Sequence, residues 1–147
     1  MLVQDALVPN PLVVTPDTTV LDFCKQVLAS NQTTACVVAG DDHKLLGMVS
    51  VHDVFQRILP AYLGKKDNLA SVIHEGYFEE RFDELRRTPV SDLMSKDIHV
   101  LAPHDSVIKA ISLFSSATHK TAPVVRDGKF IGTITRRSVL QKVTESA

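Results

Sequence analysis

Short apolar runs alternate with amphipathic stretches in the first part of the chain, and this alternation predicts a mixed fold. Three apolar runs, each bounded by proline or by a Gly-Asp turn, are typical of short buried strands: 12–14, 35–39 and 45–49. A Thr19-x-x-Asp22 capping box predicts the start of one helix, and a second helix begins at Ser50. Their expected packed faces are Val20, Cys24, Val27 and Leu28, and Val51, Val54, Phe55 and Ile58.

The same pattern returns in the second part of the chain. A shift of 87 residues superposes three motifs: Val3-x-Asp5 on Val90-x-Asp92, Val13-x-x-Pro16 on Val100-x-x-Pro103, and 34–38 on 121–125. After a two-residue deletion, 46–50 matches 131–135 at a shift of 85. The second copy predicts strands at 98–101, 122–125 and 130–134, and packed faces formed by Val107, Ile111 and Phe114 and by Val139, Leu140 and Val143. Because a unit of about 60 residues is marginal alone, we expect two β-α-β-β-α units that bury each other.

An irregular insert, residues 61–88, separates the first unit, 1–60, from the second, 89–147. Its second half predicts a helix over 75–87 with an apolar face formed by Phe78, Phe82 and Leu85. Such aromatic side chains need a surface to bury against. Packing within the module or at a dimer contact is the favoured interpretation, and a site for a foreign partner is the alternative.

Composition narrows the class of protein. The chain has 147 residues, 44% of them hydrophobic and 22% charged, which is typical of a globular protein. The net charge of −1 gives no electrostatic attraction to nucleic acid or to a membrane. No apolar run approaches a membrane span of about 20 residues, and the first residues lack the basic character of a signal peptide. We therefore expect a soluble, cytoplasmic protein.

No residue pattern indicates catalysis or a metal site. Cys24 and Cys36 lack Cys-x-x-Cys spacing and are interpreted as buried, reduced thiols. The six histidines lack the spacing of a zinc site, and no glycine-rich phosphate loop is present. Ser50, His52 and Asp53 are neighbours on one helical turn, so they cannot converge as a nucleophile, a base and an orienting acid. We expect a protein that is not an enzyme.

The stretch from Gly47 to Val54 carries the strongest candidate site. A buried strand runs directly into a helix whose first turn holds Ser50 and Asp53 side by side, next to unpaired backbone N–H groups. These groups can hold a polar ligand. The same Ser-x-x-Asp pattern is also an ordinary capping box, and the two residues alone do not decide between these interpretations.

The doubled motifs resemble a known family, the tandem cystathionine β-synthase (CBS) domain pair, or Bateman module. The resemblance rests on Val-Val-Thr-Pro-Asp-x-x-Val at 13–20, Thr-Ala-x-Val-Val at 34–38, Gly-Met-Val-Ser-x-x-Asp at 47–53, their partners in the second copy, and Asp-Leu-Met at 92–94. It implies an α+β fold in which two units pack through their sheets around a pseudo-twofold axis. It also implies two clefts that often bind adenosine-containing ligands, and association of two modules into a disc-like dimer.

The resemblance further implies which residues form the clefts. Ser50 and Asp53 would face phosphate and ribose, because a carboxylate accepts from ribose hydroxyls and a helix N-terminus favours anions. The remaining candidates in the first copy are Val14, Thr15, Thr34, Ala35, Cys36, Val49 and His52, and those in the second copy are Leu101, Thr121, Ala122, Pro123, Thr135, Arg136, Arg137 and Ser138. The implied ligand is AMP, ADP or ATP, with S-adenosylmethionine and NAD as weaker candidates, and none is an obligatory cofactor.

The second cleft departs from the first. Thr135-x-x-Ser138 keeps the hydroxyl and loses the acid, while Arg136 and Arg137 place positive charge on a first helical turn, where it opposes the helix dipole. A nearby carboxylate would relieve them, or a phosphate would, with His119 and Lys120 beside it. One hypothesis is that these arginines reach the phosphates of a ligand whose ribose lies on Asp53.

These observations predict a regulatory adenine-nucleotide-binding module. We expect it to form a homodimer and to signal to a protein partner when a ligand shifts the arrangement of its two halves. The alternative is a dimerisation or scaffold module with degenerate, empty clefts, which the missing second acid favours.

Overall fold

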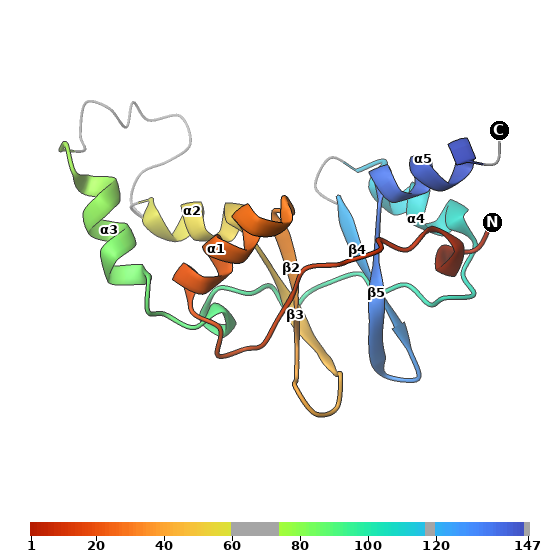
Figure 1. Cartoon of the computed structure of the whole chain (residues 1–147), viewed down its shortest axis with the longest axis horizontal. Coiled ribbons are helices and arrows are strands. Elements are labelled where there is room, and N and C mark those ends of the chain that lie inside the picture. The colour runs from red at the N-terminus through yellow and green to blue at the C-terminus, as the bar shows by residue number, and fades with distance from the viewer. Residues whose placement is uncertain (60–73, 117–119, 146–147) are drawn as a thin grey trace.

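Each half of the chain folds as a small sheet with helices on one side (Figure 1). The computed structural model describes residues 1–59, 74–116 and 120–145. In the first half, the strand order is β1-β2-β3, with β1 parallel to β2 and β2 antiparallel to β3. Its elements are β1 (Val13–Val14), α1 (Val20–Ser30), β2 (Thr34–Val38), β3 (Leu45–Ser50) and α2 (Val51–Ile58).

The second half repeats this plan with one strand fewer. Antiparallel strands β4 and β5 form its sheet, and the predicted strand at 98–101 is reduced to a single bridge between Leu101 and Val124. The elements are α4 (Val107–Phe114), β4 (Thr121–Arg126), β5 (Lys129–Thr135) and α5 (Arg136–Glu145). Together the two sheets and their helices confirm the predicted α+β class.

Strand register confirms the internal repeat residue by residue. Cys36 pairs with Met48 in the first hairpin, and Pro123 pairs with Thr133 in the second. These pairs correspond at the shifts of 87 and 85 that the sequence predicts. Each hairpin also has a register irregularity at the same place, after Val37 and after Val124.

Two short segments cross between the halves and complete the opposite cores. The 3-10 turn η1 (Val3–Ala6) buries Val3 and Ala6 among the side chains of the second half, including Leu101, Phe114 and Ile134. The turn η3 (Val90–Asp92) buries Val90 in the core of the first half. In Figure 1 the N-terminus lies beside α4 and α5, and the chain then runs across to the first sheet.

Helix α3 (Tyr77–Leu85) packs against the C-terminal end of α2. The Tyr77 hydroxyl donates to the carbonyl of Ile58 at 3.2 Å, and the Arg81 guanidinium donates to the carbonyl of Arg57 at 3.1 Å. These are carbonyls that a helix end leaves without partners. The helix is shorter than the predicted 75–87, and the irregular insert between α2 and α3 lies largely outside the described residues.

The packed faces of the helices are narrower than the sequence predicts. Phe23 and Ala110 are fully buried, whereas several residues predicted to pack are exposed: Leu28, Phe55, Ile111, Leu140 and Val143. Each sheet is only two or three strands wide, so it covers only part of each helix. These exposed apolar side chains leave uncovered surface on the helical side of the molecule.

Candidate functional site

Ser50 and Asp53 close a reciprocal capping box at the start of α2. The Asp53 N–H donates to Ser50 Oγ at 3.3 Å, and the Ser50 N–H donates to Asp53 Oδ2 at 2.8 Å. Ser50 Oγ donates to the same carboxylate oxygen at 3.1 Å. Asp53 Oδ1 has no hydrogen-bond partner among the described residues. The capping role therefore uses one carboxylate oxygen and leaves the other to accept a bond from a ligand.

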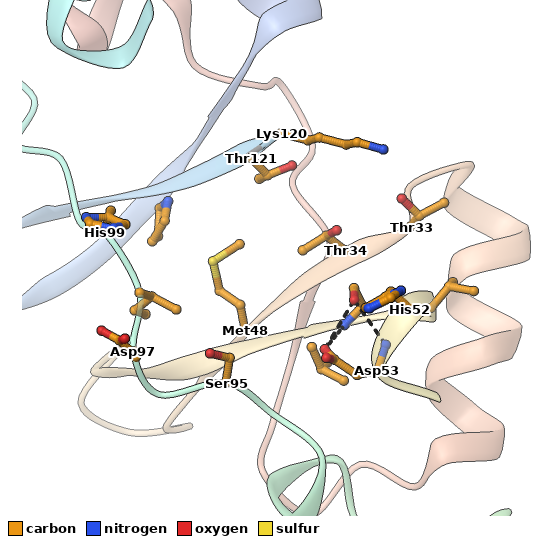
Figure 2. A pocket seen from close by; sticks show the side chains of 15 residues that line it. Thr33, Thr34, Met48, His52, Asp53, Ser95, Asp97, His99, Lys120 and Thr121 are labelled. Carbon is orange, nitrogen blue, oxygen red and sulfur yellow. Dashed lines mark hydrogen bonds between the residues drawn. The ribbon is translucent and has the colours of Figure 1, made fainter. Parts of the chain in front are cut away.

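This capped turn forms one wall of a cavity of about 560 Å³. β2, β3 and the start of α2 supply one side, and the opposite side comes from residues 95–99 and from the start of β4 (Figure 2). Both halves of the chain therefore build the cavity. Its lining is Thr33, Thr34, Met48, Val49, Ser50, Val51, His52, Asp53, Ser95, Asp97, Ile98, His99, Lys120, Thr121 and Pro123.

Hydrogen-bonding and charged groups lie on both sides of this cavity. In Figure 2, His52 and Asp53 face it from the start of α2, while His99, Lys120 and Thr121 lie on the other side. Met48 extends into the space between the two sides. The lining thus combines acceptors for sugar hydroxyls, cationic or hydrogen-bonding groups for an anion, and apolar surface from Met48, Ile98 and Pro123 for a flat ring.

The structure brings seven of the predicted site residues together in this cavity: Thr34, Val49, Ser50, His52, Asp53, Thr121 and Pro123. Five others are buried in the two sheets and their cores and do not line it: Val14, Ala35, Cys36, Leu101 and Ala122. Thr15 is also outside the lining; its hydroxyl donates to Asp17 at 2.6 Å in an exposed turn. This bond is the main cause that holds the pKa of Asp17 below its ordinary value.

The arginines of the second unit lie elsewhere. The Arg136 guanidinium donates to the carbonyls of Phe114 and Ser116 at the C-terminal end of α4, where a cation is favoured by the helix dipole. Carbonyl oxygens, rather than the carboxylate or phosphate considered from the sequence, therefore surround Arg136. Arg137 is exposed on α5, and neither arginine lines the cavity. His119 lies outside the described residues.

The second unit caps its helix without an acid. The Thr135 N–H donates to Ser138 Oγ at 2.9 Å, and the Ser138 N–H donates to Thr135 Oγ1 at 3.0 Å. Ser138 is 7% exposed and its hydroxyl donates to the Thr135 carbonyl. Neither residue lines the described cavity. The loss of the acid thus leaves the capping geometry intact.

Sequence reasoning did not predict one wall of the cavity. Ser95, Asp97, Ile98 and His99 enter it because the first residues of the second unit run alongside β3 before they reach the second sheet. This crossing is fixed by an antiparallel bridge in which Met48 and Ser95 exchange backbone hydrogen bonds at 3.0 and 2.8 Å. The sequence did contain a signal for this contact, the glycine at position 47 within the predicted strand. Gly47 directly precedes the bridge, and a Cβ there would lie 2.6 Å from the Ser95 carbonyl oxygen.

The cysteines take no part in this site. Both are free thiols; Cys36 is buried as predicted, whereas Cys24 is only half-buried. Burial raises the pKa of Cys36 to about 12 and that of Cys24 above its ordinary value. Cys36 therefore stays protonated at neutral pH. Among the described residues, no group of three metal-ligating side chains lies together. None of the helices in the described part of the chain is long and apolar enough to cross a membrane.

Comparison with known families agrees with the doubled fold. The CBS domain model matches residues 3–60 and again residues 90–145. The chain belongs to the CBS domain family. The two matches cover both copies of the repeat, so the protein is a tandem CBS pair, or Bateman module.

Relatives of this CBS pair extend over nearly its whole length. The uncharacterized protein MJ1426 of Methanocaldococcus jannaschii is 27% identical over 96% of this chain and 90% of its own. The structure of CBSX2 in complex with AMP has a TM-score of 0.73 at 24% identity, over 99% of this chain and 97% of that chain. The CBS pair of protein MJ0100, in complex with 5′-methylthioadenosine and S-adenosyl-L-methionine, has a TM-score of 0.69 at 14% identity, over 100% and 98%. These structures share the fold.

Proposed function

We propose that this CBS pair is a non-enzymatic regulatory module that binds an adenine nucleotide in the cavity beside Asp53. The observation that carries the proposal is the cavity itself, which is built by both CBS units around a capped helix start. Its volume of about 560 Å³ falls within the usual range of small-molecule sites, about 300 to 1,000 Å³. CBSX2 and MJ0100 carry adenosine-containing ligands on the same fold, which supports this ligand class.

Each part of a nucleotide has a complementary group in the cavity. Asp53 Oδ1 is placed to accept from a ribose hydroxyl, and Thr34 and Thr121 offer further hydroxyls. Lys120, His52 and His99 are the groups that can face a phosphate, while Asp97 opposes a high negative charge. This balance of charges favours AMP over ADP and ATP.

Regulation follows from the position of the ligand between the two units. A nucleotide that contacts Asp53 in one unit and Lys120 in the other binds best to a single arrangement of the halves, and so shifts the population toward that arrangement. A homodimer partner or another protein that contacts the helices would sense the shift. The exposed apolar side chains on those helices support such an association.

Calorimetric titration and thermal-shift measurement with AMP, ADP, ATP, S-adenosylmethionine and NAD test the proposal. For a Kd of about 10 μM, 1 mM ligand would stabilise the fold by about 2.7 kcal/mol. The key variant is Asp53→Asn, which keeps a capping acceptor and removes the charge; we expect it to weaken AMP binding at least about tenfold. Ser138→Ala, the corresponding position in the second unit, should leave the affinity unchanged.

Two results would reject this function. If none of the five ligands raises the melting temperature at millimolar concentration, the cavity does not bind an adenine nucleotide, and the scaffold interpretation is correct. If AMP binds equally well to Asp53→Asn and to the parent protein, the nucleotide lies elsewhere.

A further inference from the structure

Lys120 is the one lysine or arginine among the described residues that line the cavity. Two acids, Asp53 and Asp97, line it as well. Within the described part of the chain, no carboxylate forms an ion pair with Lys120. The binding of an anion therefore depends on where the Lys120 ammonium points, because the two carboxylates oppose a negative ligand.

The side chain of Lys120 extends along the cavity. Figure 2 shows it leaving the start of β4 and reaching toward the side on which Thr33 and the first turn of α2 lie, whereas Asp97 lies at the other end of the view. Lys120 is exposed, and a long lysine side chain loses conformational entropy when it is held in one direction. A neighbouring group that favours this direction would therefore lower the cost of binding an anion.

Arg136 leaves the same end of the β4–β5 hairpin as Lys120. Thr121 is the first residue of β4 and pairs with Thr135, the last residue of β5. Lys120 directly precedes Thr121, and Arg136 directly follows Thr135. Like charges at facing positions of two strands repel each other, so each of these side chains disfavours the direction that the other takes.

The Arg136 guanidinium is held at the C-terminal end of α4, outside the cavity lining. Its Nε and Nη2 both donate to the Phe114 carbonyl, and Nη2 also donates to the Ser116 carbonyl at 3.1 Å. A helix end leaves such carbonyls without partners, and the helix dipole favours a cation there. Ser116 lies four residues before Lys120. Arg136 thus fixes both a charge beside Lys120 and the point from which the chain runs to Lys120.

We propose that Arg136 is a positioning residue for Lys120. Because Arg136 is bound to the end of α4, its charge directs the Lys120 ammonium into the cavity, where the ammonium binds the phosphate of a nucleotide. Arg136 itself does not touch the ligand. This inference rests on the proposed nucleotide site, and it adds a residue of the second unit that acts on the ligand only through another side chain.

Calorimetric titration with AMP and with adenosine tests this role, because only AMP carries the phosphate. Lys120→Ala removes a charge-assisted hydrogen bond and should raise the Kd for AMP at least about tenfold. Arg136→Ala should raise the Kd for AMP by about two- to tenfold, which is the cost of ordering a lysine that is no longer directed. Neither variant should change the Kd for adenosine.

The double variant shows whether Arg136 acts through Lys120. With Lys120→Ala already present, Arg136→Ala should cause no further loss of AMP affinity, because the group that it directs is gone. Arg136→Lys keeps a cation and a donor for the α4 carbonyls, so it should recover most of the parent affinity. The control is Arg137→Ala, which removes the same charge from an exposed neighbour on α5 and should leave both Kd values unchanged.

Each result decides for or against this role. The proposal is overturned, and the nucleotide site stands, if Arg136→Ala binds AMP like the parent, if it weakens AMP and adenosine equally, or if the two single losses add in the double variant. The additivity test uses AMP alone, so it decides even where adenosine binds too weakly to measure. A parent protein that does not bind AMP would reject the proposed function and this inference with it.

Circular dichroism and thermal melting check that each variant is folded. If Arg136→Ala does not fold, Arg136→Gln takes its place in the same cycle, because the amide keeps a donor for the α4 carbonyls and removes the charge. Non-additive loss of AMP affinity in that cycle supports the positioning role, and additive loss overturns it.

Discussion

The two CBS units cap the start of their last helix with different side chains, and this difference distinguishes the capping role of these residues from a role in ligand binding. Both start their last helix with a reciprocal cap, Ser50 with Asp53 in the first unit and Thr135 with Ser138 in the second. Only the first pair lines the cavity. Because a serine caps as well as an aspartate, capping alone does not require the acid at position 53. The negative charge of Asp53 is therefore not explained by capping.

An opposite exchange occurs at the turn that precedes the first helix of each unit. The Thr15 N–H donates to the Thr18 hydroxyl in the first unit, and the Ala102 N–H donates to the Asp105 carboxylate in the second, at 3.2 and 2.8 Å. Here the second unit has the acid and the first has the hydroxyl. The two units thus keep the hydrogen-bond geometry of this turn and of the helix cap, while the residue that accepts the bond is an acid in one unit and carries a hydroxyl in the other.

The crossing segments also differ between the units. In the first unit, Met48 and Ser95 exchange two backbone hydrogen bonds; in the second, the Val8 N–H donates to the Thr133 carbonyl at 2.8 Å. A Cβ on Gly47 would come within 2.6 Å of backbone, but a Cβ on Gly132 would meet only the Leu7 side chain, at 3.6 Å. The first unit therefore holds its crossing segment more closely.

The largest expected loss of stability comes from forcing Gly47 away from the Ser95 carbonyl. Gly47→Ala places a methyl group against the Ser95 carbonyl and must displace the segment that forms one cavity wall. We expect the free energy of unfolding, measured by urea titration, to fall by about 2 to 3 kcal/mol. Gly40→Ala is the control, because its added Cβ would meet nothing within 4 Å. Equal stability of the two variants would show that the crossing segment is not held as closely as described.

A smaller effect comes from removing the N-cap hydroxyl of each unit. Ser50→Ala and Thr135→Ala each lose the acceptor for one first-turn N–H, so each should lower the free energy of unfolding by about 0.5 to 2 kcal/mol. The two variants should differ in calorimetric titration with AMP, because only Ser50 lines the cavity. A comparable loss of AMP affinity in Thr135→Ala would contradict the separation of capping from binding.

The smallest expected effect concerns acid stability. The Ala102 N–H is the main cause that lowers the pKa of Asp105 from its ordinary value, so the folded protein holds this proton less readily than the unfolded chain. The resulting stability is present above the unfolded pKa of about 3.9 and is lost as the pH falls through the lower folded pKa. Asp105→Thr, which copies Thr18, should therefore lose less stability than the parent between about pH 5 and pH 3. Urea midpoints at both pH values check this, and identical losses would contradict it.

Local patterns in the sequence predicted most of the fold. The hairpin register follows from the repeat, and the start of α2 at Ser50 follows from a cap whose partners lie three residues apart. Helical spacing identified which residues share a face, but it did not show how much of each helix the sheet covers. Leu28 was therefore expected to pack but is 83% exposed, while Phe23, which spacing alone did not select, is fully buried.

The site was less predictable because half of it depends on contacts between distant segments. Ser50 and Asp53 are neighbours on one turn, so the sequence alone brings them together. Asp97 and His99 reach the same cavity only because residue 95 pairs with β3, and Arg136 turns to α4 because a helix 22 residues earlier ends beside it. Neither placement follows from spacing within a motif.

The exchange of η1 and η3 has a consequence for how the chain folds during synthesis. The core of the first unit lacks Val90 until that residue has left the ribosome, and Val3 has no core to enter until β5 has been made. The first unit cannot close as an independent foldon in the order of translation, since its last piece is encoded beyond α3. Each core therefore closes only when a segment from the other end of the repeat reaches it, so the two units depend on each other to complete their cores.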